Sequence, residues 1–585
     1  MKLLEKKLFE HLAFLYGNET AHSVIDRFLD LIHGFQQQHA DLTERPASSK
    51  ISEKDAILIT YGDMVYQEGD APLKTLSSFL NNHLEDTIST VHILPFYPYS
   101  SDDGFSVIDY RKVNSALGTW DDIARLGKNY RLMFDAVVNH ISSQSAAFQG
   151  FLKDDPKYDE FFTVVDPEVD LSRVFRPRAQ PVLTPFETAS GTKYVWTTFS
   201  ADQIDLNFAN PDVLLEVADI LLFYAAHGAE FVRLDAVTFV WKEIGTTCIN
   251  LPQTHRIVQT MRTILDLAAP NVVLITETNV PHEDNIAYFG DGTNEAQMVY
   301  NFALPLLTLH AFKNADVRTL SEWAATLDLP SDQVTFFNFL ACHDGIGMLP
   351  VKNILSPDDL NELAAHTKAL GGFVSYKSNE DGSQSPYELN INYLDALGDP
   401  EAPMIDAEIL AQRFLATQAI MLALRGVPGI YFHSLFGSQN WKEGAEETGR
   451  PRTINREKLQ LDRVEAELND PASVRYYVFK GYKRLLKVRM DNPAFHPLGG
   501  QKILSIHKSV FALLRTSLDE GTRTLCLHNT SSENLNLSID LNALHGKESD
   551  SFTDLISQRA FAAREGQLTL QLAPYETLWL SCGVY

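Results

Sequence analysis

Short apolar segments alternate along most of the chain with longer segments whose apolar residues recur every three or four positions. Eight apolar segments rich in Val, Ile, Leu and Phe stand out, at 56–61, 90–96, 131–138, 230–237, 271–278, 298–302, 335–344 and 427–432. Continuous apolar strands separated by helical segments are typical of a parallel sheet covered by helices. One connecting helix is clearly marked at 253–270, where the helical spacing stops at Pro270. The pattern predicts an α/β fold, specifically a (β/α)8 TIM barrel.

Two connections between these strands are too long for simple crossovers. Residues 141–205 are expected to form a small subdomain inserted into the barrel, and residues 345–400 a second long loop region. Beyond residue 497 the pattern changes to short alternating runs separated by turn residues, which predicts a C-terminal antiparallel β domain at 497–585. The barrel would then span 51–496, preceded by a helical extension at 1–50.

Charge and cysteine usage narrow the class of protein. The 585 residues carry 49 Lys and Arg against 76 Asp and Glu, a formal charge of −27, which argues against nucleic acid as a partner. No stretch approaches the roughly 20 apolar residues of a membrane span, and residues 1–17 lack the apolar core of a signal peptide. The four cysteines are far apart and form no metal-binding spacing. We therefore expect a cytoplasmic protein without a membrane partner.

Charged residues gather where the predicted strands end. In a (β/α)8 barrel these ends converge on one mouth, where catalytic residues lie. A single Asp or His at a strand end is more often a cap or a satisfied polar group. A group on several strand ends instead favours a catalytic site, and the group comprises Asp102, Asp135, His140, Arg233, Asp235, Glu277, His343 and Asp344.

Three carboxylates at one barrel mouth point to glycoside chemistry. One carboxylate attacks the anomeric carbon while a protonated partner donates to the leaving oxygen. Arg233 lies two residues before Asp235 and on the same side of a strand, so we expect it to hold the pKa of Asp235 down. Glu277 follows the apolar run NVVLI, an environment that keeps a carboxyl protonated near neutral pH.

Four ordered motifs resemble the active-site signatures of the α-amylase family of glycoside hydrolases, family 13. They are DAVVNH (135–140), VRLDAVTF (232–239), ITETN (275–279) and FLACHD (339–344). By this resemblance Asp235 matches the nucleophile, Glu277 the general acid/base, and Asp344 the third carboxylate, which grips two sugar hydroxyls.

Further stretches are similar to the sucrose phosphorylase subfamily, including residues 92–110, RPR (176–178), residues 195–207, ACHDGIG (341–347) and PRTINR (451–456). The branch that acts on glucosylglycerate is the most similar, through TPF (184–186) and SPYELN (385–390) among others. The resemblance implies a set of residues that bind the glucosyl ring: Asp102, Phe105, His140, Arg233, His343 and Arg452. Within that set, Asp102 and Arg452 would clamp the far side of the ring, and Phe105 would stack on it.

The implied reaction is phosphorolysis of a small α-glucoside, sucrose or glucosylglycerate, to α-glucose 1-phosphate and fructose or glycerate through a covalent intermediate. Candidates for phosphate and acceptor are Arg176, Arg178, Tyr387 and Glu388. An RPR segment is equally typical of a solvated surface turn. Glu388 replaces a glutamine usual in sucrose-specific members, so the acceptor stays open. We expect no cofactor and no metal site, because nucleotide loops, HExxH and dense calcium-ligand runs are missing.

Two other hypotheses remain open at this stage. The same carboxylates would serve an α-glucosidase or transglucosidase that passes glucose to water or to another sugar. A non-catalytic sugar-binding barrel is the third possibility, against which the joint presence of Asp235, Glu277 and Asp344 argues. Members of the subfamily are monomers or homodimers, and we expect the same here.

Overall fold

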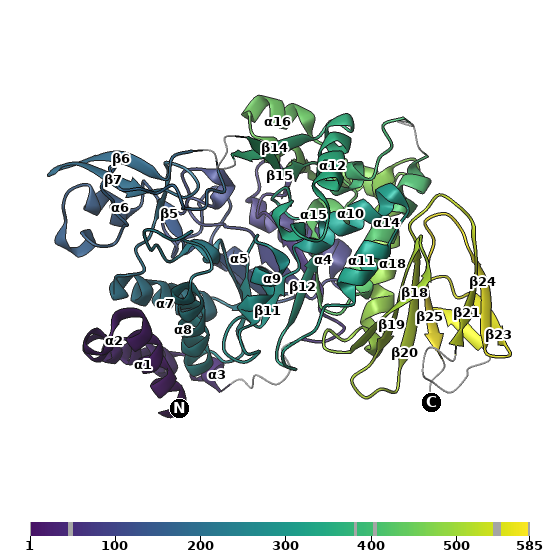
Figure 1. Cartoon of the computed structure of the whole chain (residues 1–585), viewed down its shortest axis with the longest axis horizontal. Coiled ribbons are helices and arrows are strands. Elements are labelled where there is room, and N and C mark those ends of the chain that lie inside the picture. The colour runs from purple at the N-terminus through teal and green to yellow at the C-terminus, as the bar shows by residue number, and fades with distance from the viewer. Residues whose placement is uncertain are drawn as a thin grey trace.

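The barrel strands are the eight predicted segments. A computed structural model describes residues 2–44, 51–178, 180–378, 383–401, 406–541 and 551–582. In it, eight parallel strands close a barrel in the order β1, β16, β12, β11, β10, β9, β4 and β3 (Figure 1). Their bounds are β1 Ile57–Thr60, β3 Thr90–Ile93, β4 Arg131–Ala136, β9 Ala229–Leu234, β10 Val273–Thr276, β11 Met298–Tyr300, β12 Thr335–Phe339 and β16 Val427–Tyr431. The predicted TIM barrel is confirmed.

Helices connect the strands and cover the outside of the barrel. The main ones are α4 Pro72–Leu84, α5 Trp120–Leu126, α7 Pro211–Ala226, α8 Pro252–Ala268, α10 Ala303–Asn314, α11 Arg318–Ala324, α14 Ala407–Ala423 and α18 Val474–Met490. Helix α8 is the predicted crossover: Pro252 occupies its first turn, where a missing N–H costs nothing, and it ends two residues before Pro270. It buries an apolar face that includes Ile257, Met261 and Ile264.

The insertion after β4 forms a small subdomain beside the barrel. Strand β5 (His140–Ser142) pairs antiparallel with β8 (Gln203–Asp205), and between them lie α6 (Ala146–Phe151) and the hairpin of β6 (Leu183–Thr188) and β7 (Gly191–Trp196). Val165, Val174, Val182 and Trp196 form a separate apolar cluster there. The pairing of β5 with β8 fixes this subdomain at the end of β4.

The long connection after β12 contains its own three-stranded sheet. Strand β15 (Gln384–Asn390) pairs with β13 (Ile346–Gly347) and β14 (Phe373–Ser378), and α12 (Pro357–Ala369) packs against it. A capping box between Ser356 and Asp359 starts α12. Residues 379–382 of the predicted loop region lie outside the described residues.

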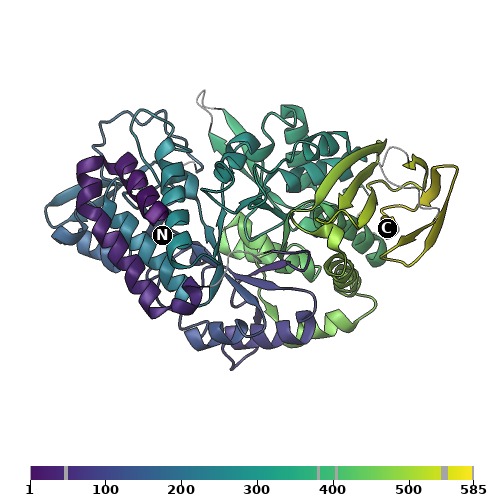
Figure 2. The same cartoon turned by 90° about the horizontal axis from the view of Figure 1, so that it is seen from below.

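The C-terminal part is an antiparallel sheet, as predicted. Its eight strands run in the order β18, β19, β20, β25, β22, β23, β24 and β21. Their bounds are β18 Gly500–His507, β19 Val510–Thr516, β20 Arg523–Asn529, β21 Leu535–Asp540, β22 Ser551–Asp554, β23 Ala560–Arg564, β24 Gln567–Leu572 and β25 Thr577–Cys582. This sheet lies at one end of the molecule's long axis, and the inserted subdomain and N-terminal helices lie toward the other (Figures 1 and 2).

The chain begins with helices that rest on the outside of the barrel. Helices α1 (Lys2–Tyr16), α2 (Asn18–Gln38) and α3 (Ala40–Thr43) contact α8, and α2 also contacts α7 (Figure 2). A search of the described helices for a segment both long and apolar enough to span a membrane found none. The boundaries at 50, 141, 205, 345, 400 and 496 remain predictions.

Candidate active site

The two carboxylates predicted to do the chemistry follow directly on neighbouring strands. Asp235 comes one residue after β9 and Glu277 one residue after β10. Their backbones are held in place because the Asp235 N–H donates to Ala136 O (3.1 Å) and the Glu277 N–H to Leu234 O (3.0 Å). Parallel pairing of β9 with β10 thus brings both carboxylates to one edge of the barrel.

Arg233 is the cation at the centre of these acids. Its Nη1 donates to Asp235 Oδ1 at 2.8 Å and also to Asp135, which in turn accepts from His92 Nε2 at 2.6 Å. Its Nη2 lies 3.9 Å from Glu277 Oε2. The Arg233 side chain is only 2% exposed, so these charges interact without screening by water.

Burial raises the pKa of both carboxyls. The pKa of Glu277 rises to about 7, because it is buried beside the negative charges of Asp235 and Asp344, while Arg233 opposes the rise. Burial also raises the pKa of Asp235 above its ordinary value, again against the effect of Arg233. The expectation of a lowered pKa for Asp235 was therefore wrong in its net direction, since burial outweighs the arginine. Arg233 is 2.8 Å from Asp235 but 3.9 Å from Glu277, which favours the proton on Glu277.

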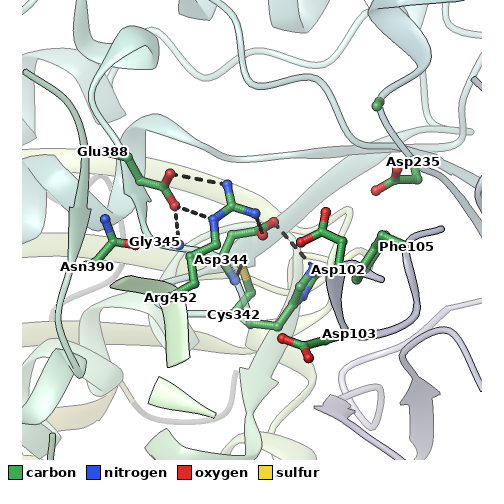
Figure 3. Close-up of polar contacts among 12 residues, drawn as sticks. Asp102, Asp103, Phe105, Asp235, Cys342, Asp344, Gly345, Glu388, Asn390 and Arg452 are labelled. Carbon is green, nitrogen blue, oxygen red and sulfur yellow. Dashed lines mark hydrogen bonds and ion pairs between the residues drawn. The ribbon is translucent and has the colours of Figure 1, made fainter. Parts of the chain in front are cut away.

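Arg452 joins the third carboxylate to Glu388 (Figure 3). It lies in the 3-10 turn η6 (Pro451–Asn455); its Nη1 pairs with Asp344, while its Nε and Nη2 donate to the two oxygens of Glu388 at 2.8 and 3.2 Å. Glu388 Oε1 also accepts the Gly345 N–H at 2.6 Å. Although partial burial acts to raise the pKa of Asp344, Arg452, His343 and Arg456 together lower it, so Asp344 stays ionised.

Most of the predicted site residues line one cavity at the barrel mouth. They are Asp102, Phe105, His140, Arg178, Asp235, Glu277, His343, Asp344, Tyr387 and Arg452. Arg233 and Glu388 lie directly behind this lining, through their contacts with Asp235 and Arg452. Arg176 is exposed and is not brought to the cavity, in keeping with a surface turn at that position.

The residues expected at the closed end of the cavity contact neighbouring protein groups there. Phe105 stacks on His343, with ring centroids 4.7 Å apart and an interplanar angle of 6°. His140 Nε2 lies 2.8 Å from Phe105 O. Asp102 accepts from Gln203 Nε2 at 3.2 Å, whereas Arg452 pairs with Asp344 and Glu388. Asp102 and Arg452 therefore line the same cavity without a hydrogen bond to each other in the part of the chain described.

The sequence of this chain is similar to those of known proteins. Residues 82–346 match the model for the catalytic domain of α-amylase. Glucosylglycerate phosphorylase from Spirochaeta thermophila is 48% identical over 581 residues, which are 98% of this chain and 98% of that protein. The chain belongs to the glucosylglycerate phosphorylase branch of the α-amylase family. Both the family and the branch predicted from the motifs are confirmed.

Two further phosphorylases resemble this chain, one in sequence and one in fold. Sucrose phosphorylase from Bifidobacterium adolescentis is 30% identical over 463 residues, covering 75% of this chain and 85% of that protein. The crystal structure of sucrose 6F-phosphate phosphorylase from Thermoanaerobacter thermosaccharolyticum superposes with a TM-score of 0.71 at 24% identity, covering 89% of this chain and 98% of that one. That likeness concerns the fold.

Several residues at the site of this α-amylase family member were not predicted from the sequence motifs. Gln203 hydrogen-bonds Asp102, Phe105 O and His140, and Asn279 and Phe302 also line the cavity. Lys242, buried behind the cavity, bonds Asp205 Oδ2 (2.7 Å), Asn139 Oδ1 (3.0 Å) and Phe239 O (2.6 Å). Gln203 lies in the stretch 195–207 and Asn279 in the motif ITETN, so the sequence resemblance could have pointed to both residues. Lys242 stands in FVWKEIGTTCI (239–249), a stretch that also resembles the glucosylglycerate branch, but its contacts were not predictable because its partners come from three separate segments.

Proposed function

We propose that this chain is a retaining phosphorylase whose donor is glucosylglycerate, converting it with phosphate to α-glucose 1-phosphate and glycerate. An enzyme of the disaccharide phosphorylase type, acting on an α-glucoside, follows from its family. The choice of donor is supported by 48% identity to a glucosylglycerate phosphorylase against 30% to a sucrose phosphorylase. The proposed chemistry rests on one observation: Asp235 and Glu277 lie beside the same arginine, Arg233, which is closer to Asp235 than to Glu277.

The first displacement breaks the glucosidic bond. Asp235, ion-paired with Arg233, attacks the anomeric carbon, and Glu277 gives its proton to the departing oxygen of the acceptor. A pKa of about 7 suits Glu277 to this task, because at neutral pH it holds a proton and can still release it. Asp344, kept ionised by Arg452, favours the positive charge that develops on the sugar ring.

The second displacement brings in phosphate. Once the acceptor has left, a phosphate oxygen attacks the same carbon from the vacated side while Glu277, now ionised, takes up the phosphate proton. Two inversions give a product with retained configuration.

Arg178 is the cation best placed to receive the phosphate dianion. It lines the cavity, and no carboxylate among the described residues forms an ion pair with it. Arg233 and Arg452 already have carboxylate partners. Arg233 pairs with Asp135 and Asp235, and Arg452 pairs with Asp344 and Glu388. Glycerate also carries a negative charge, so one uncommitted guanidinium can meet the carboxylate of the departing acceptor and then the incoming phosphate. The charge of Glu388 is offset in part, because its carboxylate accepts hydrogen bonds from Arg452 and from the Gly345 N–H.

A donor panel tests the proposal directly. Sucrose, glucosylglycerate, glucosylglycerol and sucrose 6′-phosphate are incubated with the enzyme, with and without phosphate, and glucose and glucose 1-phosphate are measured. We expect glucose 1-phosphate from glucosylglycerate at the highest kcat/KM, and only when phosphate is present. Equal release of free glucose with and without phosphate would instead identify a hydrolase, and faster phosphorolysis of sucrose would overturn the assigned donor.

A further inference from the structure

The loop formed by residues 100–106 carries two cavity residues in a strained backbone. It follows β3 and contains the 3-10 turn η1 (Asp102–Gly104), in which φ is 53° at Asp102, 51° at Asp103 and 111° at Gly104. A side chain at Gly104 would meet Pro95 O at 2.6 Å. Left-handed conformations at consecutive residues persist only where surrounding contacts impose them. The contacts that impose them here therefore decide where Asp102 and Phe105 lie.

One set of contacts comes from Asp202, in the inserted subdomain just before β8. Its carboxylate accepts hydrogen bonds from the hydroxyls of Ser100, Ser101, Ser106 (2.8 Å) and Ser143 (2.5 Å). Its backbone oxygen accepts from Ser106 Oγ (2.8 Å) and from the Ser143 N–H (3.1 Å). Although burial acts to raise the pKa of Asp202, these hydroxyls lower it overall, so the carboxylate is ionised at neutral pH.

A second contact holds the opposite side of the loop. Asp103 pairs with Arg456 Nη1 at 2.5 Å, and Arg456 Nε donates to His343 O at 2.8 Å. In Figure 3, Asp102 and Phe105 lie toward Asp235, whereas Asp103 lies away from it. The loop is thus held from the inserted subdomain by Asp202 and from the segment after η6 by Arg456.

We infer that Asp202 is a positioning residue for the glucosyl subsite: by binding three serines of the 100–106 loop it sets the places of Asp102 and Phe105. The inference rests on the proposed function only in assigning glucose to the closed end of the cavity. Asp202 itself is not among the residues lining that cavity. It acts through the loop and through its neighbour Gln203, which donates to Asp102 at 3.2 Å.

The test compares Asp202→Asn with a matched control, Asp170→Asn. Asp170 is an exposed aspartate of the same subdomain, and its carboxylate accepts from Ser172, whose N–H donates at 2.9 Å, and not from the 100–106 loop. An amide at position 202 keeps the size of the side chain but cannot accept all four hydroxyls. We expect the Kd for glucose, measured by calorimetry, to rise about tenfold in Asp202→Asn and to stay unchanged in the control.

The kinetic readout separates positioning from general damage. In Asp202→Asn the KM for the donor should rise by about the same tenfold factor while the KM for phosphate stays the same. Ser101→Ala removes one of the four hydroxyls and should raise the glucose Kd about threefold, which keeps the test decisive if Asp202→Asn folds poorly. Unchanged glucose Kd values in both variants, or equal changes for donor and phosphate, would overturn the inference. A wild type that binds glucose without phosphorolysis would overturn only the proposed function.

Discussion

At the residue scale, two nearby carboxylates of the site, those of Asp235 and Glu277, have different roles. Asp235 and Glu277 are both largely removed from water and lie near Arg233, yet of these two acids Arg233 hydrogen-bonds only Asp235. Because the ion pair stabilises a negative charge on Asp235, a single proton shared by the two acids settles on Glu277. The barrel supplies this asymmetry through strand register, since Arg233 lies on β9, Asp235 directly follows β9, and Glu277 directly follows the neighbouring strand β10.

The pH dependence of the reaction follows from the pKa of Glu277. Its acid form must donate to the leaving oxygen, and that form is lost as the pH rises through about 7. We therefore expect kcat/KM for the donor to fall as the pH rises above this value, with an apparent pKa of about 7. Initial rates between about pH 5 and 9 measure this. A rate that rose across pH 7 would mean that Glu277 acts first as a base.

Replacing Glu277 tests the same role without changing the pH. Glu277→Gln should lower kcat/KM for the natural donor by roughly 10²- to 10⁴-fold. The loss should be much smaller for α-glucosyl fluoride, because fluoride leaves without a proton. Equal losses for the two donors would show that Glu277 acts in another way.

At the element scale, the inserted subdomain is joined to the barrel by a buried lysine. Lys242 Nζ reaches Asp205 at the end of β8, Asn139 after β4, and the carbonyl of Phe239 beyond β9. The side chains of Lys242 and Asp205 are 6% and 0% exposed. One ammonium therefore connects three segments that are distant in sequence, and removing it would leave a buried carboxylate short of a counter-ion.

Lys242→Met should lower the free energy of unfolding by about 3 to 5 kcal/mol, because the charge of Asp205 stays buried. Lys193→Met is the matched control in the same subdomain. Lys193 pairs with Asp154 at 3.1 Å but is 24% exposed, so its loss should cost no more than about 1 kcal/mol. Urea unfolding followed by circular dichroism measures both. Equal effects of the two substitutions would contradict the role given to Lys242.

At the scale of the whole molecule, the C-terminal sheet is fixed to the barrel by a buried arginine without a carboxylate partner in the described residues. Arg515 on β19 donates to Ala423 O at the end of α14 (2.7 Å), to His496 O (2.8 Å) and to Gly500 O (3.1 Å). Burial lowers its pKa to about 9, so it is still charged at neutral pH. It satisfies three carbonyls at the junction between barrel and sheet.

Arg515→Met should destabilise the whole chain by about 3 kcal/mol, since it removes three buried hydrogen bonds at this junction and leaves the His496 carbonyl with the Gly499 N–H as its donor. The exposed Arg564 on β23 provides the control, and Arg564→Met should change stability by less than about 0.5 kcal/mol. Thermal unfolding by calorimetry checks both values. A more stable Arg515→Met would indicate that relief from a buried charge outweighs the lost hydrogen bonds.

The sequence was sufficient for the barrel and for the residues that stand in strands. Segments such as 271–278 contain an unbroken apolar run, here 272–275, because both faces of a barrel strand are buried, and the charged residue that follows the run is then conspicuous. The link from Arg452 to Glu388 was not predictable, because it joins η6 to β15 across 64 positions. The net pKa of Asp235 was misjudged for a related reason: the arginine is visible in the sequence, whereas the depth of burial depends on the whole fold.

Other features of the site were not predictable because they depend on the path of the loops. Arg176 and Arg178 were equivalent candidates in RPR, and only the course of the inserted subdomain separates the exposed one from the one at the cavity. The serines around Asp202 likewise come from two segments that meet only in the folded chain.

Trapping the glucosyl-enzyme tests the central claim most directly. Glu277→Gln is incubated with α-glucosyl fluoride without phosphate, digested, and its peptides are analysed by mass spectrometry. We expect one glucosyl unit on the peptide containing Asp235, attached to that carboxylate, and release of α-glucose 1-phosphate when phosphate is added to the intact adduct. A glucosyl group on another residue, or release of the β anomer, would contradict the double displacement at Asp235.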